Sequence, residues 1–373
     1  MKGWVALSAL AYAGVGTAVL RAAPLDRRAG PSPLDPPGSM PSISVVVPAR
    51  NEADKIGLLL GDLRRAIRPG MEAEVIVVDD GSDDGTGPLA ASLGATVLGA
   101  GDRPAGWNPK AWALSQGAAR AANDVLVFLD ADVRLAPDAL DTVAAELAGA
   151  GGLVSVAPHH RAVGPFEALA AGPDTVTVAG GGPGLRPGPH AAGAVGSCLA
   201  IARADYHRIG GHGATPATIV DDIDLARAAR RHGLPVSLRR GGSVVWVRSH
   251  PDGLGAVVEG FSKNLAAGLT RTPAPSTIAV SAWIAALVWP LVLAARGRWR
   301  GALLAWAAAA LQTWWITRRV GRYQPLVTSA GAPLLGVFLT ALTARSVVAR
   351  STGRPIRWKG RPLDARGLEV GSP

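Results

Sequence analysis

The order of apolar and polar positions divides the chain into a central part and two apolar ends. Four runs contain no charged residue, and they are 3–20, 276–295, 301–317 and 326–344. A helix needs roughly 17–25 predominantly apolar residues to cross a bilayer. The pattern therefore predicts transmembrane helices at both ends, with an N-terminal anchor in 1–23 and two or three crossings in 273–349.

The first run is expected to be an uncleaved anchor rather than a signal peptide. No clean A-x-A cleavage site follows it, and it is longer than the roughly 7–15 apolar residues of a signal peptide. Lys2 precedes the run, and Arg21, Arg27 and Arg28 follow it. By the positive-inside rule, this charge distribution places the next domain in the cytoplasm. A Pro-rich stretch, 24–41, is expected to be a linker.

The end of the chain, 350–373, is rich in basic residues, which favours a cytoplasmic tail. Three crossings before it would instead place this tail outside. The run 301–317 is the shortest of the four and contains Gln312, so it either crosses the membrane or lies re-entrant or at the surface. We therefore expect a multi-pass protein of the cell membrane with its central domain and its tail in the cytoplasm.

The central part, 42–272, alternates short apolar runs with stretches at helical spacing. Strands are predicted at 42–47, 74–78, 95–98, 124–129, 152–157 and 243–247. Helices are predicted at 53–67, 86–94, 110–121 and 137–148. This alternation is typical of an α/β domain, a Rossmann-like and mostly parallel sheet with helices on both faces. Ligands bind such sheets beyond the carboxyl ends of the strands.

Polar clusters follow three of these strands, so we expect them to converge on one crevice. They are Arg50-Asn51-Glu52, Asp79-Asp80 and Asp130-Ala131-Asp132. Residues i and i+2 of a strand point to the same face, and paired carboxylates suit Mg²⁺ or Mn²⁺, which bridge diphosphate oxygens. Neither G-x-G-x-x-G after a strand nor G-x-x-x-x-G-K-[ST] occurs, so the Rossmann and P-loop phosphate cradles are excluded.

The distribution of charge narrows the possible partners. The chain has a net charge of +10, yet residues 41–272 carry 21 Lys and Arg against 24 Asp and Glu. The excess of basic residues therefore belongs to the two ends, where it fits lipid headgroups and topology signals. An acidic central domain argues against nucleic acid as a partner. The single cysteine, Cys198, excludes an intramolecular disulfide and a cysteine-based zinc site.

Four segments in order resemble the family 2 glycosyltransferases of GT-A fold. They are VVPARNE at 46–52, VVDDGSDDGT at 77–86, LDAD at 129–132 and VDDIDLARAARRHG at 220–233. The resemblance covers about 42–270. It implies transfer of a sugar from a UDP- or GDP-linked donor, with inversion at the anomeric carbon.

The resemblance also implies roles for the matching residues. Those implied in donor binding are Pro48, Arg50, Glu52, Asp79, Asp80, Lys110 and Asp130. Asp130 and Asp132 would hold the divalent metal. His250, after the strand at 243–247, is a further candidate for the metal or the diphosphate, with a packed or surface histidine as the alternative. Lys110 lies in NPKAWALSQG, where Pro109 replaces the family's usual Gly.

Asp222 would be the general base that deprotonates the acceptor, with Asp221 where the family has Glu. An inverting displacement needs a base that faces the anomeric carbon opposite the diphosphate. A desolvated carboxylate beside other carboxylates has a raised pKa, which improves it as a base. The segment 221–224 also fits the N-terminal cap of a helix, and the two roles are compatible.

The acceptor is expected to be a lipid. The Q-x-x-R-W segment of processive family members does not occur in the sequence. The segments GWNPKAW at 106–112 and WKGR at 358–361 resemble a subgroup that includes glycosyltransferases of carotenoid and hopanoid pathways. That resemblance implies non-processive transfer of one hexose to a lipid hydroxyl or carboxyl at the cytoplasmic membrane face. Transfer to a polyprenyl phosphate, or a non-catalytic membrane protein that retains the fold, are the alternatives.

Overall fold

The computed structural model describes residues 14–16, 18–19, 21–26, 41–182, 191–248, 250–251, 253–262, 265–358, 361–364 and 368–370. Most of the predicted anchor and linker, and part of the basic tail, lie outside these residues. Val15 and Val19, from the anchor, are buried in the same apolar cluster as Ile316 near the other end of the chain. The crossing of a membrane by the first run stays a prediction.

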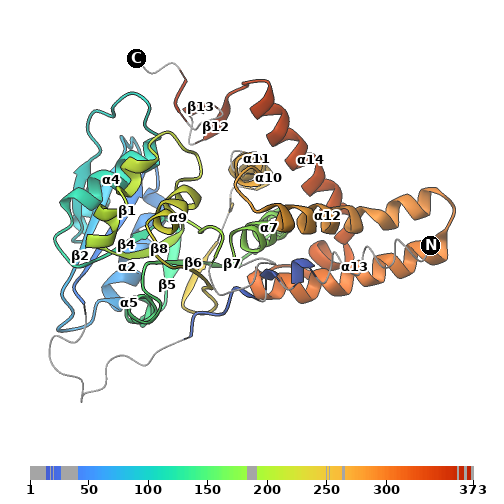
Figure 1. Cartoon of the computed structure of the whole chain (residues 1–373), viewed down its shortest axis with the longest axis horizontal. Helices are drawn as coiled ribbons and strands as arrows, with labels where there is room; N and C mark the ends of the chain where they lie inside the picture. Colours follow the sequence, from blue (N-terminus) through green and yellow to red (C-terminus); the bar gives the residue numbers. More distant parts are fainter. Residues whose placement is uncertain are drawn as a thin grey trace.

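A seven-stranded mixed sheet forms the centre of the α/β domain, on the left in Figure 1. Its order is β3 (Thr96–Gly99), β2 (Ala73–Asp79), β1 (Ile43–Ala49), β4 (Val125–Leu129), β8 (Cys198–Ala202), β6 (Leu153–Ala157) and β9 (Val236–Arg240). Strand β8 runs antiparallel to both of its neighbours, and the other pairs are parallel. The predicted α/β class is confirmed, and the strands β8 and β9 were missing from the prediction.

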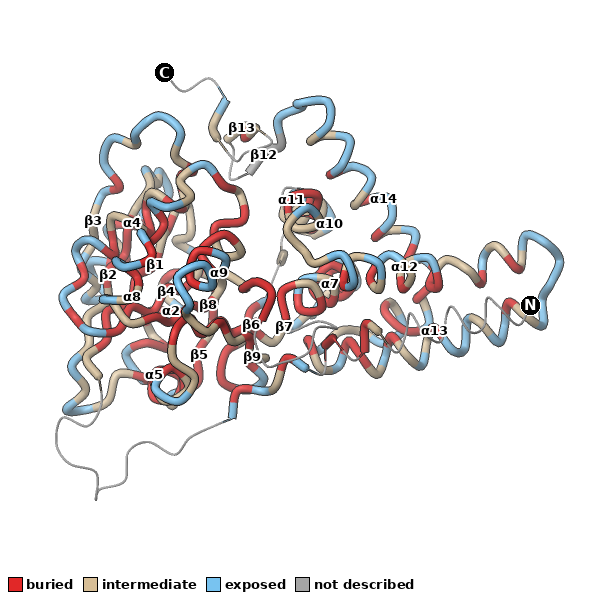
Figure 2. The backbone as a smooth tube through the Cα atoms, viewed as in Figure 1, coloured by how far each residue is buried: buried red, intermediate tan, exposed pale blue. Residues whose placement is uncertain are grey.

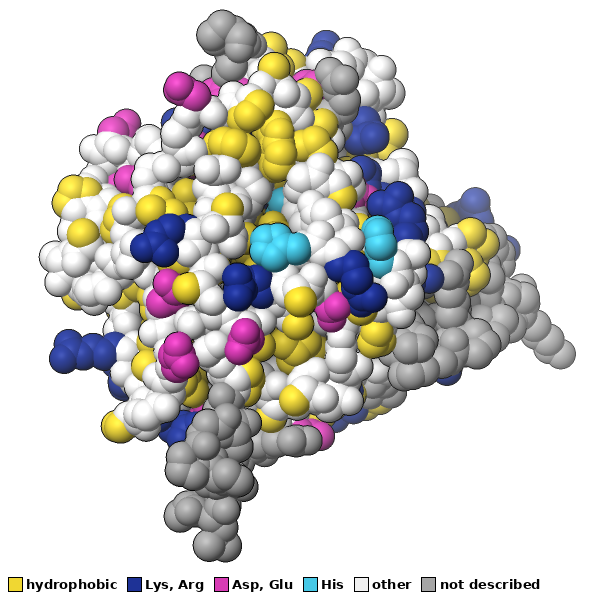
Figure 3. Space-filling model, turned by 60° about the vertical axis from the view of Figure 1, so that its left-hand side comes forward, with side chains coloured by type: hydrophobic (Ala, Val, Ile, Leu, Met, Phe, Trp, Pro, Cys, Tyr) yellow, Lys and Arg dark blue, Asp and Glu magenta, His cyan; other side chains and the backbone are white. Residues whose placement is uncertain are grey.

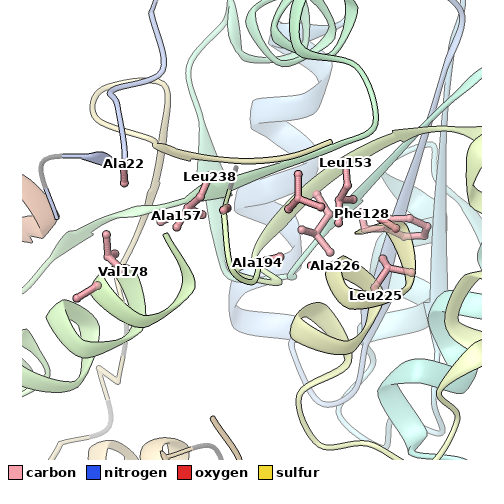
Figure 4. Packing of buried hydrophobic residues seen from close by; sticks show 14 of the residues in the cluster. Ala22, Phe128, Leu153, Ala157, Val178, Ala194, Leu225, Ala226 and Leu238 are labelled. Carbon is pink, nitrogen blue, oxygen red and sulfur yellow. The ribbon is translucent and has the colours of Figure 1, made fainter. Parts of the chain in front are cut away.

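Alternate positions of the central strands face two separate apolar clusters. Val46 of β1 joins the cluster that includes Leu225, whereas its neighbours Val45 and Val47 join the cluster that includes Leu59. The elements on the first side are α4 (Pro109–Arg120) and α9 (Asp221–Arg231), and those on the second are α2 (Ala53–Ala66) and α5 (Ala139–Ala150). Figure 4 shows part of the first cluster, and Figure 2 shows buried residues concentrated in the sheet. Helices on both faces were predicted and are present.

Smaller elements complete the domain. Helix α3 (Thr86–Ser92) lies between β2 and β3, and β8 leads into α8 (Arg203–Arg208). A second sheet has the order β11 (Gly321–Arg322), β7 (His159–Arg161), β10 (Val245–Val247) and β5 (Val133–Leu135). Because β11 follows the long helix α13, this sheet joins the C-terminal helices to the α/β domain.

Three long helices follow the domain, and they are α12 (Ala274–Ala295), α13 (Trp299–Val320) and α14 (Ala332–Ser351). Helices α12 and α13 extend away from the sheet in Figure 1, and α14 runs back past α10 and α11. Within the described part of the chain, α12 and α14 are long and apolar enough to cross a membrane, by length and composition. Apolar helices at the C-terminal end therefore agree with expectation, and the number of crossings and the side of the tail stay predictions.

Short helices connect the domain to this group. They are α6 (Pro165–Ala168), α7 (Ala171–Gly181), α10 (Leu254–Ser262) and α11 (Leu265–Leu269). Helix α7 packs against α12, α13 and α14, and α10 and α11 pack against α14. A final hairpin, β12 (Ile356–Trp358) with β13 (Arg361–Leu363), follows α14, and β12 lies beside α10 (Figure 1).

Candidate active site

A cavity of ≈ 690 Å³ opens at the carboxyl ends of β1, β2 and β4, which is where the sequence predicted a crevice. Parallel pairing places the three polar clusters at this edge because parallel strands end on the same side of a sheet. The predicted site residues that line the cavity are Pro48, Arg50, Glu52, Asp80, Lys110, Asp130, Asp132, Asp221, Asp222 and His250. The structure therefore brings together nearly all of the predicted site.

Asp79 is the predicted residue that is not among the cavity's lining residues. Its Oδ1 accepts hydrogen bonds from the Ser82 amide (2.9 Å) and the Ser82 hydroxyl (2.6 Å). The carboxylate of Asp79 therefore holds the turn after β2, while the neighbouring Asp80 reaches the cavity. A role of Asp79 in direct donor binding stays a prediction.

The loops after β1 and β2 are tied together by hydrogen bonds. Asn51 has a φ of 51°, a left-handed conformation that Asn tolerates better than most residues. The backbone amide of Asn51 donates to the Ser82 hydroxyl (3.0 Å), and the side-chain Oδ1 of Asn51 accepts from the backbone amide of Asp83 (3.0 Å). The Glu52 amide donates to Thr86 Oγ1 (2.9 Å). These bonds fix the two loops that carry Arg50 and Asp80 as one unit.

Lys110 reaches the cavity from the first turn of α4. Asn108 caps this helix, because its Oδ1 accepts from the amides of Lys110 (3.0 Å) and Ala111 (3.3 Å). Pro109 occupies a first-turn position, where its fixed φ and missing N–H are tolerated, so the exchange of Gly for Pro is compatible with the helix. The Lys110 Nζ lies 2.6 Å from Asp130 Oδ1.

The ammonium of Lys110 is the positive centre of an acidic site. Burial alone would lower its pKa, but the charges of Asp130, Asp221 and Asp222 outweigh burial and raise it. Lys110 therefore stays charged and links the two acidic groups of the cavity. A cation held there is suited to stabilise negative charge that develops on a leaving diphosphate.

Asp222 lies at the start of α9 and is held by two backbone amides. Its Oδ2 accepts from Gly196 N (2.7 Å), and its Oδ1 accepts from Ile223 N (2.8 Å). Burial and the charge of Asp221 raise the pKa of Asp222 to about 7, against the lowering effects of Lys110 and the two amides. Each oxygen keeps a further lone pair. Asp222 is therefore a fixed carboxylate poised to accept a proton near neutral pH.

Asp221 faces a buried histidine, His212. His212 Nε2 lies 3.9 Å from Asp221 Oδ2, and neither atom has a hydrogen-bond partner among the residues that the structure describes. The other ring nitrogen of His212 lies 2.8 Å from the Tyr206 hydroxyl. Burial lowers the pKa of His212 to about 4 despite the nearby Asp221, so the ring is neutral at pH 7.

The predicted metal ligands lie in the cavity but do not form a complete protein site. Among the described residues there is no group of three or more His, Cys, Asp or Glu arranged to hold a metal. Mg²⁺ usually takes one or two carboxylates and completes its shell with water and substrate phosphates. Asp130 and Asp132, both at the cavity, fit that type of site, and metal binding stays a prediction.

His250 forms part of the cavity wall in a left-handed conformation (φ 58°). Its ring packs 5.1 Å from that of Phe261, and a Cβ added at Gly260 would lie 2.5 Å from its Cε1. Helix α10 therefore packs directly against the imidazole ring of His250. A role of His250 as a metal ligand is not supported by a ligand cluster and stays a prediction.

A buried polar cluster at the base of the C-terminal helices was not predicted. Tyr323 donates to Asp174 Oδ2 (2.7 Å), which lies 3.2 Å from His160 Nδ1. Burial raises the pKa of Asp174 to about 8 and lowers the pKa of His160 to about 3. Both groups are therefore uncharged at neutral pH. His160 and Asp174 line the cavity, so its wall is polar but neutral at this point.

The cavity has an apolar side opposite the carboxylates. It is built by α7, α10, α11 and α12, whose lining residues include Val176, Val178, Ala256, Phe261, Leu265, Leu269 and Val280. Because α12 is one of the two helices that could cross a membrane, this side leads toward the apolar part of the molecule. On the face shown in Figure 3, acidic and basic side chains are interspersed with apolar ones.

Comparisons with known proteins agree with this geometry. The family model described as glycosyl transferase family 2 matches residues 44–174. The 4,4'-diaponeurosporenoate glycosyltransferase of Staphylococcus aureus (strain USA300) is 31% identical over 332 residues, which cover 86% of this chain and 88% of that protein. The solved structure of the mannosyltransferase PcManGT from Pyrobaculum calidifontis, in complex with GDP-Man and Mn²⁺, is 22% identical, with a TM-score of 0.55 over 93% of this chain and 97% of that one.

Proposed function

This chain belongs to glycosyltransferase family 2 and has a GT-A fold, and we propose that it transfers a single hexose from a nucleotide-sugar to a lipid. The proposed reaction inverts the anomeric carbon and takes place at the cytoplasmic face of the membrane. The observation that carries the proposal is the two-sided cavity. Carboxylates and Lys110 form one side, and apolar helices that continue into α12 form the other.

The carboxylate side supports the chemical step. In a single displacement the acceptor oxygen attacks the anomeric carbon, and the bond from that carbon to the nucleotide diphosphate breaks. Where the acceptor is a hydroxyl, Asp222 takes its proton, because the raised pKa of Asp222 matches a base that works near neutral pH. The ammonium of Lys110 is placed to stabilise the departing diphosphate.

A divalent metal is expected to share that task. Asp130 and Asp132 would hold it, and bound Mg²⁺ or Mn²⁺ would neutralise charge on the diphosphate oxygens. PcManGT, which shares the fold, was solved with GDP-Man and Mn²⁺. The donor base is proposed to be uracil or guanine.

The apolar side supports a lipid acceptor. Helices α7, α10, α11 and α12 place apolar side chains on the cavity while α12 and α14 have the length and composition of membrane spans. An acceptor could therefore remain in the bilayer while its polar end reaches Asp222. The Staphylococcus aureus relative is named for 4,4'-diaponeurosporenoate, which is consistent with a hydrophobic acceptor.

Mass spectrometry of lipids from cells with and without the gene tests the proposal directly. We expect a hexosylated lipid that disappears with the gene and with the Asp222→Asn variant. Turnover of nucleotide-sugar with unaltered rates in both Asp222→Asn and Asp132→Ala would contradict the assignment. If Asp222→Asn kept activity with a polyprenyl phosphate, the acceptor would be a phosphate, which is already ionised and needs no base.

A further inference from the structure

The chain returns to the donor side of the cavity after its last long helix. Arg361, the first residue of β13, places its Nη1 2.6 Å from Asp80 Oδ2. The Nη2 of the same side chain donates to the Asp80 carbonyl oxygen (3.2 Å). The two residues are 281 positions apart in sequence. In the sequence, Arg361 belongs to a basic tail and to the subgroup-like segment WKGR at 358–361, and neither feature assigned it a role in the site.

A second ion pair fastens the same segment. Glu369 accepts from Arg103 Nη2 (2.8 Å), and its other oxygen lies 3.5 Å from Arg361 Nε. All three side chains are mostly buried, with exposed fractions of 16 to 20%. Leu363, two residues after Arg361, is 1% exposed and lines the cavity. At Leu363 the tail therefore forms part of the cavity wall instead of being solvated.

The pairing matters because a partner of opposite charge keeps the Asp80 carboxylate ionised, and an ionised carboxylate accepts hydrogen bonds with both oxygens. Burial raises the pKa of Asp80 to about 6, while Arg50 and Arg103 counteract this effect. The nearest atom of Arg50 lies 4.0 Å from Asp80 Oδ2, beyond hydrogen-bond distance. The contact from Arg361 is much closer and favours the ionised carboxylate. A carboxylate has about four lone-pair sites, so Asp80 can still accept further hydrogen bonds.

We propose that Arg361 is a positioning residue for the donor nucleotide: it orients Asp80 and, with Leu363, completes the nucleotide pocket. The inference rests on the proposed function and on the role in donor binding that the family resemblance implies for Asp80, with hydrogen bonds from the base or ribose of the nucleotide to its carboxylate. The tail that follows the membrane helices then belongs to the donor site. Donor affinity depends on Arg361, whereas the displacement at Asp222 does not.

The test uses the full chain in detergent micelles and measures calorimetric binding of UDP and of GDP, each with Mn²⁺. Arg361→Gln is expected to lower the affinity for whichever nucleotide the wild type binds by about tenfold. The reason is that the change removes a charged hydrogen-bond partner of Asp80. The KM for the donor should rise similarly, while kcat at saturating donor stays within about twofold. Arg361→Lys should recover part of the affinity. Arg354→Gln, an exposed change of the same charge in the same tail, is the control.

A double-mutant cycle separates positioning from a general structural effect. In the Asp80→Asn background, Arg361→Gln should lower the nucleotide affinity much less than it does in the wild type. Full additivity would mean that Arg361 does not act through Asp80. Wild-type affinity in Arg361→Gln would overturn the proposal, and tighter binding would show that the tail obstructs the pocket. Melting midpoints identify a folding defect, and in that case Arg361→Lys and the cycle decide.

Failure of this inference is distinguishable from failure of the proposed function. If the wild type binds a nucleotide and Arg361→Gln binds it equally well, the tail proposal fails and the transfer reaction stands. If Asp222→Asn and Asp132→Ala keep full turnover, the proposed mechanism fails whatever Arg361 does. Absence of binding of both UDP and GDP to the wild type would overturn both.

Discussion

The amide of Gly196 donates a 2.7 Å hydrogen bond to Asp222 Oδ2, which fixes the carboxylate at the start of α9 to the segment before β8. The two residues approach so closely that a Cβ on Gly196 would lie 3.2 Å from the Cβ of Asp222. Placement of the proposed base therefore depends on a position without a side chain. This relationship links the proposed catalytic role of Asp222 to backbone packing, and both can be tested.

Asp222→Asn should abolish most of the transfer to a hydroxyl acceptor. The amide keeps the size of the carboxylate but cannot take the acceptor proton, so kcat should fall by about 10²–10⁴-fold. Donor affinity should change little, because the loss affects the attacking group. Turnover and UDP or GDP binding measured on the same preparation check this. Retained turnover with a hydroxyl acceptor would show that another group is the base.

Gly196→Ala should disturb the base without affecting the fold. The added methyl group would lie 3.3 Å from Asp222 Oδ2, so the carboxylate must shift by a few tenths of an ångström. Because such displacements reduce reaction rates strongly, we expect kcat to fall by about tenfold, with an unaltered KM for the donor. Gly193→Ala is the matched control, since its nearest neighbours would lie at 3.6 Å, an ordinary contact. Equal kcat in both variants would contradict the packing role.

The rate should depend on pH through the ionisation of Asp222. Its pKa is raised to about 7, and only the ionised form accepts a proton, so kcat/KM should decline as the pH falls through about 7. The charge of Lys110 lowers the pKa of Asp222. Lys110→Gln should therefore move this acidic limb to higher pH, besides reducing the maximal rate. A pH profile of both proteins decides, and a limb that stays in place in Lys110→Gln would exclude the coupling.

Much of the fold could be predicted because buried parallel strands are continuous apolar runs. The predicted run 74–78, for example, lies within β2, and Asp80, which follows this strand, lies at the cavity. Strand β8 was missed because CLAIA follows a Gly-rich stretch and pairs with β4 and β6, which are distant in sequence. Pairing of this kind depends on tertiary structure rather than on a local pattern.

For the site residues, too, some features could be predicted from the local sequence and others depend on tertiary structure. Motif position predicted the cavity carboxylates, yet it could not distinguish Asp79, which holds a turn, from Asp80, which faces the cavity. The pairing of Asp80 with Arg361 and that of His160 with Asp174 join distant segments, and a single sequence holds no signal for them. Local motifs therefore predict which side chains serve a site, and packing decides how each is held.

Asp224→Asn should destabilise the junction between α9 and the segment that leads into the C-terminal helices. Arg271 donates to Asp224 from Nη2 (2.9 Å), Thr218 donates to the same carboxylate (2.7 Å), and Asp224 is 8% exposed. Loss of the charge should lower the free energy of unfolding by about 1–3 kcal/mol. Asp205→Asn, which breaks the more exposed pair with Arg208, should cost less than about 1 kcal/mol. Denaturant unfolding followed by circular dichroism would refute this ranking if the two variants were equally stable.

The polar Gln312 within the third apolar run is expected to stabilise the contact between α12 and α13. Its Oε1 accepts from Trp283 Nε1 (2.9 Å), and the Trp283 side chain is fully buried. Gln312→Leu would leave the indole N–H buried without this partner, so we expect a loss of about 1–2 kcal/mol. In the Trp283→Phe background, where the donor is absent, the same change should cost clearly less. Thermal unfolding of the four proteins in one detergent measures the coupling, and equal losses in both backgrounds would show that the hydrogen bond contributes nothing.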